Sequence, residues 1–296
     1  MLKIASLAAS FIASSAIAQN AQPAADMPEP DAPPVIEPLA QNWTIRIEPY
    51  VGYIGPSGDL RLPSSTTRGG EIKLDSLNLD SPRLLPIGRI QAHRGKWRFG
   101  FNGLGFDASD RGAVQTGPGQ IGAVGFAAGD RLASDLSYQT FDILASYRVI
   151  EHISDTNDQG KARVNVGIDV IAGLRFHQAD IEVRSLRPSP LTAGTPLLAS
   201  ANEVFAEPVV GARLDLNIFE QFGMEVESLV GGFGFGDRSS VSFSIDAGFV
   251  YRPTPPIGIK VGYRLLAFDL IDGDGADEFN WAGSVAGLYF GAQFSF

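Results

Sequence analysis

The sequence lacks cysteine, contains only three histidines and has no long uninterrupted apolar stretch. Without cysteine, the protein can have no disulfides, thiolate metal sites, cysteine nucleophiles or acylated lipoprotein cysteine. No segment reaches about 18 consecutive apolar residues, which argues against a helical membrane protein. Cations are also in the minority, and the formal net charge is -10. An acidic chain is a poor partner for nucleic acid, whose phosphates need a basic surface.

The N-terminal region predicts an export signal followed by a tail. Lys3 gives a positive start, residues 4–17 are apolar or small, and Ala16 and Ala18 supply a small-x-small cleavage pattern. This pattern predicts a signal peptide over residues 1–18, cleaved after Ala18. Residues 19–41 are rich in proline, alanine, glutamine and acids, which predicts a disordered periplasmic spacer. Residues 42–296 then form the folded domain.

From residue 43 onward, apolar and polar residues alternate with a period of two. Val164, Val166 and Ile168, for example, are separated by Asn165 and Gly167. Alternation sustained over about 9–11 residues matches a β-strand that spans a bilayer. Ten segments follow the pattern, some of them weakly: 43–53, 84–93, 97–107, 136–149, 162–176, 210–218, 224–233, 241–251, 257–265 and 281–296.

The strand count has two points of ambiguity. Leu104 and Phe106 interrupt the alternation in segment 97–107, so the sequence does not fix its outer end. Segments 59–62 and 71–74 would raise the count to twelve but are too short to span. The sequence therefore predicts an all-β, antiparallel, up-and-down transmembrane β-barrel of about ten strands, with eight and twelve as the alternatives.

The connections test this prediction independently. Links on one side are short (94–96, 151–161, 220–221 and 252–256), whereas the other side has the long ones (54–83, 108–134 and 178–206). Short periplasmic turns and long external loops are typical of bacterial outer-membrane barrels. A soluble lipocalin-like barrel would also alternate. The export signal and the aromatic residues near strand ends favour the membrane barrel.

The C-terminal segment ends on an aromatic side chain. Phe290, Phe294 and Phe296 share one face of the last predicted strand, as in bacterial outer-membrane barrels, and we interpret them as a signal for the barrel-assembly machinery. Segments 90–100, 207–213, 230–234 and 262–266 resemble an uncharacterised family of Gram-negative outer-membrane β-barrel proteins, similar to the small barrels of the OmpA transmembrane domain. The resemblance covers most of residues 43–296 and implies the fold, but no known reaction.

Charges of both signs fall on the inward positions of the predicted strands. Isolated charges in a confined lumen are costly, so we expect them to pair. They could select solutes in a water-filled pore, or form a structural network that fills a narrow barrel. Ten strands favour the network, because open channels generally need about 16–18 strands. The set consists of Arg46, Glu48, Arg89, Arg98, Asp142, Arg148, Arg163, Asp169, Arg175, Arg213, Asp215, Glu225, Glu227, Asp246, Lys260 and Arg264.

Charged residues in the predicted outer loops can be interpreted either as binding groups or as ordinary solvated surface charge. Asp272, Asp274, Asp277 and Glu278 offer oxygen ligands of the kind hard cations prefer, but their spacing is not that of a calcium loop, so we predict a solvated turn. Basic side chains could contact lipopolysaccharide phosphates or be ordinary surface charge. They are Arg68, Lys73, Arg83, Arg111, Arg131, Arg184, Arg187 and Arg238.

A lipid-modifying enzyme would need a nucleophile oriented by a base. His93 and His152 are predicted at periplasmic turns and His177 near the outer rim, where spacing places no serine beside it. The sequence therefore favours a structural or surface-interaction role in the outer membrane, without catalysis, metal or cofactor. Outer-membrane lipids and lipopolysaccharide are the expected partners. A narrow diffusion channel is the first alternative, and an enzyme that modifies lipid A or phospholipid is the second.

Overall fold

A computed structural model describes residues 42–296 except 65–68, 155–163, 187–196 and 220. The predicted signal peptide, the predicted tail and lumen residue Arg163 lie outside the described residues. Ten long strands form the barrel. They are β1 (Thr44–Arg61), β3 (Arg83–Arg94), β4 (Trp97–Val114), β7 (Arg131–Ile153), β8 (Val164–Ser185), β9 (Leu198–Ile218), β10 (Phe222–Phe235), β11 (Arg238–Thr254), β12 (Ile257–Asp272) and β13 (Phe279–Ser295).

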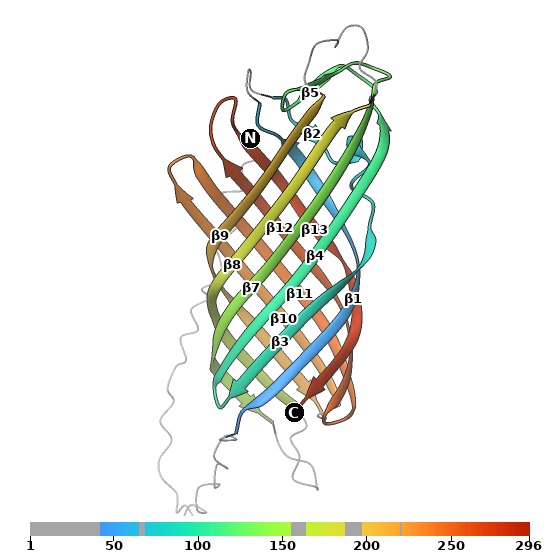
Figure 1. The fold of residues 1–296 in the computed structure, drawn as a ribbon. Helices are drawn as coiled ribbons and strands as arrows, with labels where there is room; N and C mark the ends of the chain where they lie inside the picture. Colours follow the sequence, from blue (N-terminus) through green and yellow to red (C-terminus); the bar gives the residue numbers. More distant parts are fainter. Residues whose placement is uncertain (1–41, 65–68, 155–163, 187–196, 220) are drawn as a thin grey trace, which may run out of the picture. The chain divides into compact units, whose positions relative to one another are not determined.

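Each long strand pairs antiparallel with the next, and β13 pairs with β1, which closes the ring (Figure 1). Ile45 and Phe296 exchange two backbone hydrogen bonds, with N···O distances of 3.0 and 2.9 Å, so the last residue completes the closing ladder. The closure requires glycine, because a Cβ atom on Gly287 would overlap the carbonyl oxygen of Tyr53. The predicted antiparallel up-and-down barrel of about ten strands is confirmed.

The two ends of the barrel differ in their connections. Tight turns join β3 to β4 and β11 to β12 at one end, as at Gly95, whose φ of 58° lies in the left-handed region that favours glycine. The opposite end carries β2 (Ile72–Lys73), a short 3-10 turn η1 (Asp75–Leu77) and a hairpin of β5 (Gly119–Ile121) and β6 (Val124–Phe126). In outer-membrane barrels the short turns are periplasmic. We therefore call the two ends the periplasmic end and the outer end.

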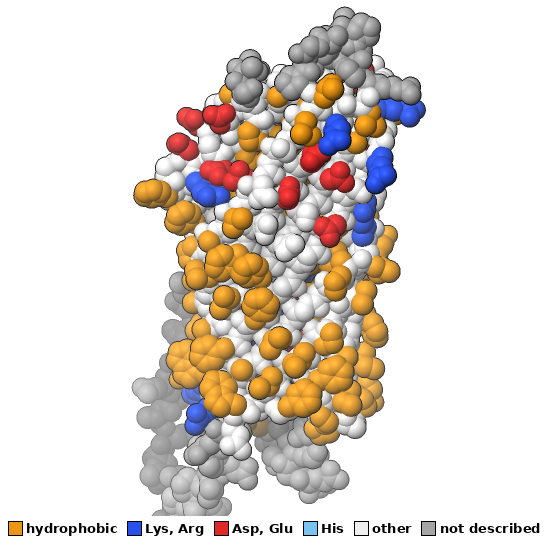
Figure 2. Space-filling model, viewed as in Figure 1, with side chains coloured by type: hydrophobic (Ala, Val, Ile, Leu, Met, Phe, Trp, Pro, Cys, Tyr) orange, Lys and Arg blue, Asp and Glu red, His pale blue; other side chains and the backbone are white. Residues whose placement is uncertain are grey.

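A belt of exposed apolar side chains surrounds the periplasmic part of the barrel, and Figure 2 shows it on one face. On β12, Ile257, Ile259, Val261 and Tyr263 all face outward, and each is 43–50% exposed. Soluble monomers rarely expose apolar patches of this extent, whereas a bilayer requires them. Within the described residues, no helix has both the length and the apolar character to cross a membrane.

Beyond the belt, the strands continue but the apolar face changes sides. On β8, Phe176 is the last apolar residue that faces outward; after it, Asp180 is exposed and Glu182 is partly exposed. The inward positions there are fully buried apolar side chains: Ala179, Ile181 and Val183. We call this part the outer head, defined as the described residues of 55–83, 105–139, 177–203, 237–239 and 269–284. Inside the belt most buried side chains are charged or polar, whereas inside the outer head most are apolar.

The outer head has a packed aromatic and aliphatic core. Trp281 is fully buried, and its ring lies 5.1 Å from that of Tyr138 and 4.8 Å from that of Phe268, measured between centroids. The connections at the outer end add further fully buried side chains to this core: Leu77, Ile121 and Val124. The core therefore closes the outer end of the lumen.

The outer head corrects the predicted loop boundaries. Parts of the predicted loops 54–83, 108–134 and 178–206 are strand, because β1, β4, β8 and β9 all extend into the head. The break in alternation at Leu104 and Phe106 has the same cause. Both side chains face inward and are buried, since the apolar face has moved to the inside at this level. The short segments near residues 59 and 72 are the end of β1 and the two-residue strand β2.

Candidate functional site

Charged side chains from most of the strands converge on the lumen within the belt. Arg46, Arg98, Arg148 and Arg264 are partly buried there, and Arg163 lies outside the described residues. The remaining predicted lumen residues are buried, each less than a tenth exposed: Glu48, Arg89, Asp142, Asp169, Arg175, Arg213, Asp215, Glu225, Glu227, Asp246 and Lys260. The structure therefore places these predicted residues together inside the barrel.

At the periplasmic end, arginines hold two aspartates. Arg148 donates through Nε to Asp169 Oδ1 at 2.7 Å and also bonds Asp215. Arg98 donates to Asp215 Oδ2 at 2.8 Å. These residues come from β4, β7, β8 and β9, so the cluster ties four strands together.

In the middle of the lumen, Lys260 is fully buried between two glutamates. Its Nζ lies 2.6 Å from Glu225 Oε2 and 3.4 Å from Glu48 Oε2. Arg46 reaches the other oxygen of Glu225 at 2.9 Å, and the hydroxyl of Tyr50 donates to Glu48. Each buried charge therefore has an opposite partner, as burial demands.

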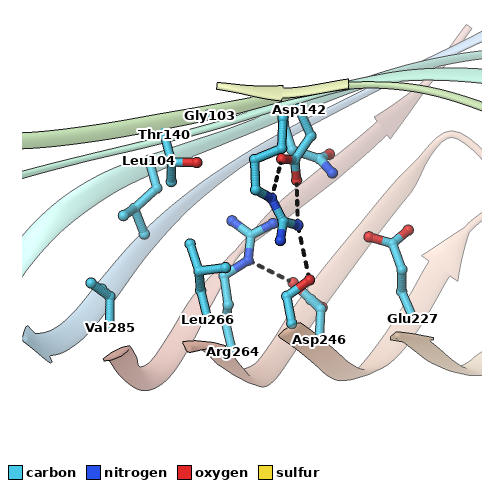
Figure 3. A pocket seen from close by; sticks show the side chains of 12 residues that line it. Gly103, Leu104, Thr140, Asp142, Glu227, Asp246, Arg264, Leu266 and Val285 are labelled. Carbon is cyan, nitrogen blue, oxygen red and sulfur yellow. Dashed lines mark hydrogen bonds and ion pairs between the residues drawn. The ribbon is translucent and has the colours of Figure 1, made fainter. Parts of the chain in front are cut away.

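The upper lumen is filled by arginine–carboxylate pairs. Arg175 forms a bidentate pair with Asp142, with distances of 2.7 and 3.2 Å, and Arg213 bonds Glu227. Figure 3 shows Asp142 on one wall of a small cavity, with Asp246 and other charged side chains on the opposite wall. The cavity volume is about 20 Å³. That is room for about one water molecule, so no solute fits there.

A buried polar chain separates the charged lumen from the head core. The hydroxyl of Tyr138 lies 2.6 Å from His177 Nδ1, and His177 Nε2 lies 3.2 Å from Glu207 Oε1. His177, predicted near the outer rim, is fully buried on β8 eight residues before that strand ends, and its side chain points inward. Ser242 donates to Glu207 rather than to the imidazole. Among the described residues, the serine–base pair that an acyl-transfer enzyme needs is not formed at His177.

Sequence reasoning missed Glu207, which is fully buried on β9. The predicted strand began at residue 210 and the predicted loop ended at residue 206, so Glu207 was assigned to neither. Extending the alternation of Arg213 and Gly211 toward the N-terminus would have placed Glu207 on the inward face. Its neighbours there, Tyr138 and Ser242, carry no charge and were not considered as lumen residues.

The barrel wall has two places where the ladder between neighbouring strands stops early. Pairing of β9 with β10 ends at Val209↔Gly231, next to Pro208, although both strands continue. Proline has no N–H to donate, which suits it to the edge of a sheet. Pairing of β3 with β4 likewise ends at Ile87↔Leu104.

An arginine covers each of these free strand edges. Arg238 donates to the carbonyl oxygen of Val204 on β9 at 2.5 Å. Arg83 donates to the carbonyl oxygens of Asp107 and Ser109 on β4, both at 3.3 Å. Unpaired edges invite pairing with other chains, and these contacts block it. Two of the arginines considered for lipopolysaccharide contact thus bind the barrel's own backbone.

Other outer charges are also engaged locally. Arg184 donates to Glu182 at 2.7 Å, and Arg61 binds Glu278 at the end of the acidic loop. Arg68 and Arg187 lie outside the described residues. In the part of the chain that the structure describes, no group of three carboxylate or histidine side chains is arranged to hold a metal ion.

A carboxylate pair lies beside Arg238 in the outer head. Arg238 Nη2 is 3.4 Å from Glu203 Oε2 and 3.3 Å from Asp272 Oδ2. Burial and the hydrogen bond and negative charge of Asp272 raise the pKa of Glu203 to about 7. The folded head therefore binds a proton at Glu203 more tightly than the unfolded chain does.

This raised pKa predicts that the outer head loosens locally as pH rises. The stabilisation is fully present below pH 4.5 and is lost as pH passes through about 7, because two carboxylates then face one arginine. Amide hydrogen exchange near residues 198–205 and 270–274, corrected for intrinsic rates, should be faster at pH 8 than at pH 5. Glu203→Gln should remove this dependence, whereas Glu182→Gln on the exposed face of β8 should keep it. An equal response of both variants contradicts the assignment.

Comparison with known proteins bears only on the fold of the chain and indicates no activity. No protein-family model matches the chain, and no curated protein matches it. Among solved structures, it is similar to the outer membrane protease OmpT of Escherichia coli (10% identity, 88% of this chain and 99% of that one, TM-score 0.48) and to Neisserial surface protein A (11%, 86% and 97%, 0.34). Ail, the attachment invasion locus protein of Yersinia pestis, is also similar (11%, 85% and 99%, 0.32).

The predicted antiparallel up-and-down barrel fold is confirmed by the strand pairing of the chain itself. The chain is an outer-membrane-type β-barrel. Identities of 10–11% and TM-scores below 0.5 transfer no activity. The strand pairing and the apolar belt of the chain itself carry the assignment.

Proposed function

We propose that the protein is a closed structural barrel of the Gram-negative outer membrane that presents its outer head to the exterior. The observation that supports this is the filling of the lumen at two levels. Ion pairs in the upper lumen leave a cavity of only about 20 Å³. Above them, the core around Trp281 closes the outer head. Diffusion of a solute through the barrel would require both the ion pairs and the core of the outer head to move aside.

The partners follow from the two surfaces. The belt suits outer-membrane lipids, and the exposed side chains of the head, such as Asp75, Asp135 and Asp180, suit surface contacts. Lipopolysaccharide would meet both, and Phe290, Phe294 and Phe296 would serve recognition by the assembly machinery. A lipid-modifying enzyme is the weaker proposal, because both ring nitrogens of His177 are already bonded.

Planar-bilayer recording tests the closed barrel. The purified protein should give no single-channel steps over a range of salt concentrations, because side chains block the lumen. A variant with Arg175→Gly, Arg213→Gly and Arg264→Gly should also give no steps, because the core around Trp281 still closes the outer head. Heat modifiability on gels would confirm that both proteins insert as folded barrels. Regular steps from the unchanged protein would overturn the proposal in favour of the channel.

A further inference from the structure

A second and larger cavity opens at the periplasmic end of the lumen. Its volume is about 270 Å³, and it lies beneath the periplasmic ends of β1, β4, β7, β9 and β11. Five cationic side chains line it: Arg46, Lys96, Arg98, Arg148 and Arg252. We call this cavity the vestibule. The ion pairs above it fill the lumen, so the vestibule is a pocket with one mouth.

The carboxylates in the vestibule are already neutralised. Asp169 and Asp215 are both held by Arg148, and Arg98 also binds Asp215. Glu225 is shared between Arg46 and the fully buried Lys260 behind it. The fourth carboxylate, Glu151, lies 3.8 Å from Arg148. These acids have no spare charge with which to balance further cations.

Two cations are left without a carboxylate. Arg252 donates to Asn217 Oδ1 at 2.9 Å, and neither Arg252 nor Lys96 has an ion pair within the described residues. Some nitrogen donors of the arginines that do form ion pairs also lack a hydrogen-bond acceptor among the described residues. Arg98 Nη1 and Arg46 Nε are buried, and neither has a hydrogen-bond partner in the described part of the chain. Unpaired buried donors and a surplus of positive charge both call for an acceptor with negative charge.

We propose that the vestibule binds a small oxyanion, a carboxylate or phosphate group presented from the periplasm. Guanidinium groups bind such groups through paired, charge-assisted hydrogen bonds. A volume of about 270 Å³ is slightly below the range of about 300–1,000 Å³ usual for drug-sized ligands, so the site suits an anionic group with a small body. Arg252 is the binding residue, and the aspartates hold Arg98 and Arg148 in place.

Isothermal titration of the folded protein in an uncharged detergent tests the site. Inorganic phosphate and N-acetyl-alanine serve as phosphate and carboxylate probes, at constant ionic strength and low chloride. We expect binding of at least one probe, weakened roughly 10- to 100-fold by Arg252→Gln, the loss typical of a hydrogen bond to a charged group. Arg184→Gln in the outer head, where the side chain is 58% exposed, is the matched control and should bind like the unchanged protein.

The possible outcomes distinguish a phosphate ligand from a carboxylate ligand. They also include the results that would overturn the proposed anion site. Stronger binding of phosphate points to a lipid or nucleotide-type headgroup, and stronger binding of N-acetyl-alanine points to the carboxylate of a cell-wall or protein chain. Equal loss in Arg252→Gln and Arg184→Gln would mean non-specific charge attraction and would overturn the site. So would the absence of binding of either probe at millimolar concentration, while heat modifiability shows that the protein is folded.

Discussion

Lys260→Met should destabilise the barrel by about 3–5 kcal/mol, the usual effect of removing one partner from a buried ion pair. Lys260 is fully buried and lies between Glu225 and Glu48. Without the ammonium, Glu48 retains only Arg46 at 3.8 Å and the hydroxyl of Tyr50 as partners. The free energy of unfolding in urea with detergent micelles, followed by tryptophan fluorescence, measures the effect.

Two further variants determine whether lost charge pairing is the cause. Adding Glu48→Gln to Lys260→Met should recover part of the loss, because an uncharged amide is less costly to bury than an orphaned carboxylate. Lys73→Met on the exposed strand β2 should change stability by no more than about 0.5 kcal/mol. A loss in Lys260→Met no larger than that in Lys73→Met would show that the lumen is solvated rather than packed.

Trp281→Ala should cost about 3–5 kcal/mol, as expected for an aromatic side chain removed from a packed core. Trp281 is fully buried in the outer head, where it contacts Tyr138, and it also contacts Phe268, one residue before the head on β12. The loss should be concentrated there, because the belt and the ion pairs of the lumen lie below. Urea unfolding gives the total, and hydrogen exchange should show faster exchange in the head than at the periplasmic end.

Phe235→Ala is the matched aromatic control. Phe235 lies at the end of β10 and is 80% exposed, so its removal creates no cavity and should change stability by no more than about 0.5 kcal/mol. If the two variants lose the same free energy, or if exchange in Trp281→Ala rises evenly along the strands, the head has no packed core of its own.

The fold was predictable because alternation and turn asymmetry are local features of the sequence. Segments 162–176 and 257–265 predict strands from period two alone, and short links at 94–96 and 220–221 orient them. The outer ends were not predictable in the same way. Period two reveals that two faces differ, but which face is apolar depends on whether lipid or water lies outside. Leu104 and Phe106 mark the change and were interpreted as a break.

The candidate lumen residues were accessible to sequence reasoning as a set but not as pairs. Alternation places Arg46 and Glu225 on inward faces, and charge balance predicts that such groups pair. The partners, however, are 179 positions apart and meet only because the ring closes. The vestibule depends on the same closure, since Arg252 and Arg98 come from strands that are not adjacent. Spacing along one strand cannot reveal a contact across a ring.

The length of β8 sets how far the protein projects from the cell. Its 22 residues span roughly 70 Å at about 3.3 Å per residue. A tilt of about 40° reduces that to a height of roughly 55 Å, against an apolar band of about 25 Å. The tips of the strands therefore stand about 30 Å beyond the hydrocarbon. Antibodies, phages or neighbouring cells would reach the tips of these strands without penetrating the lipid layer.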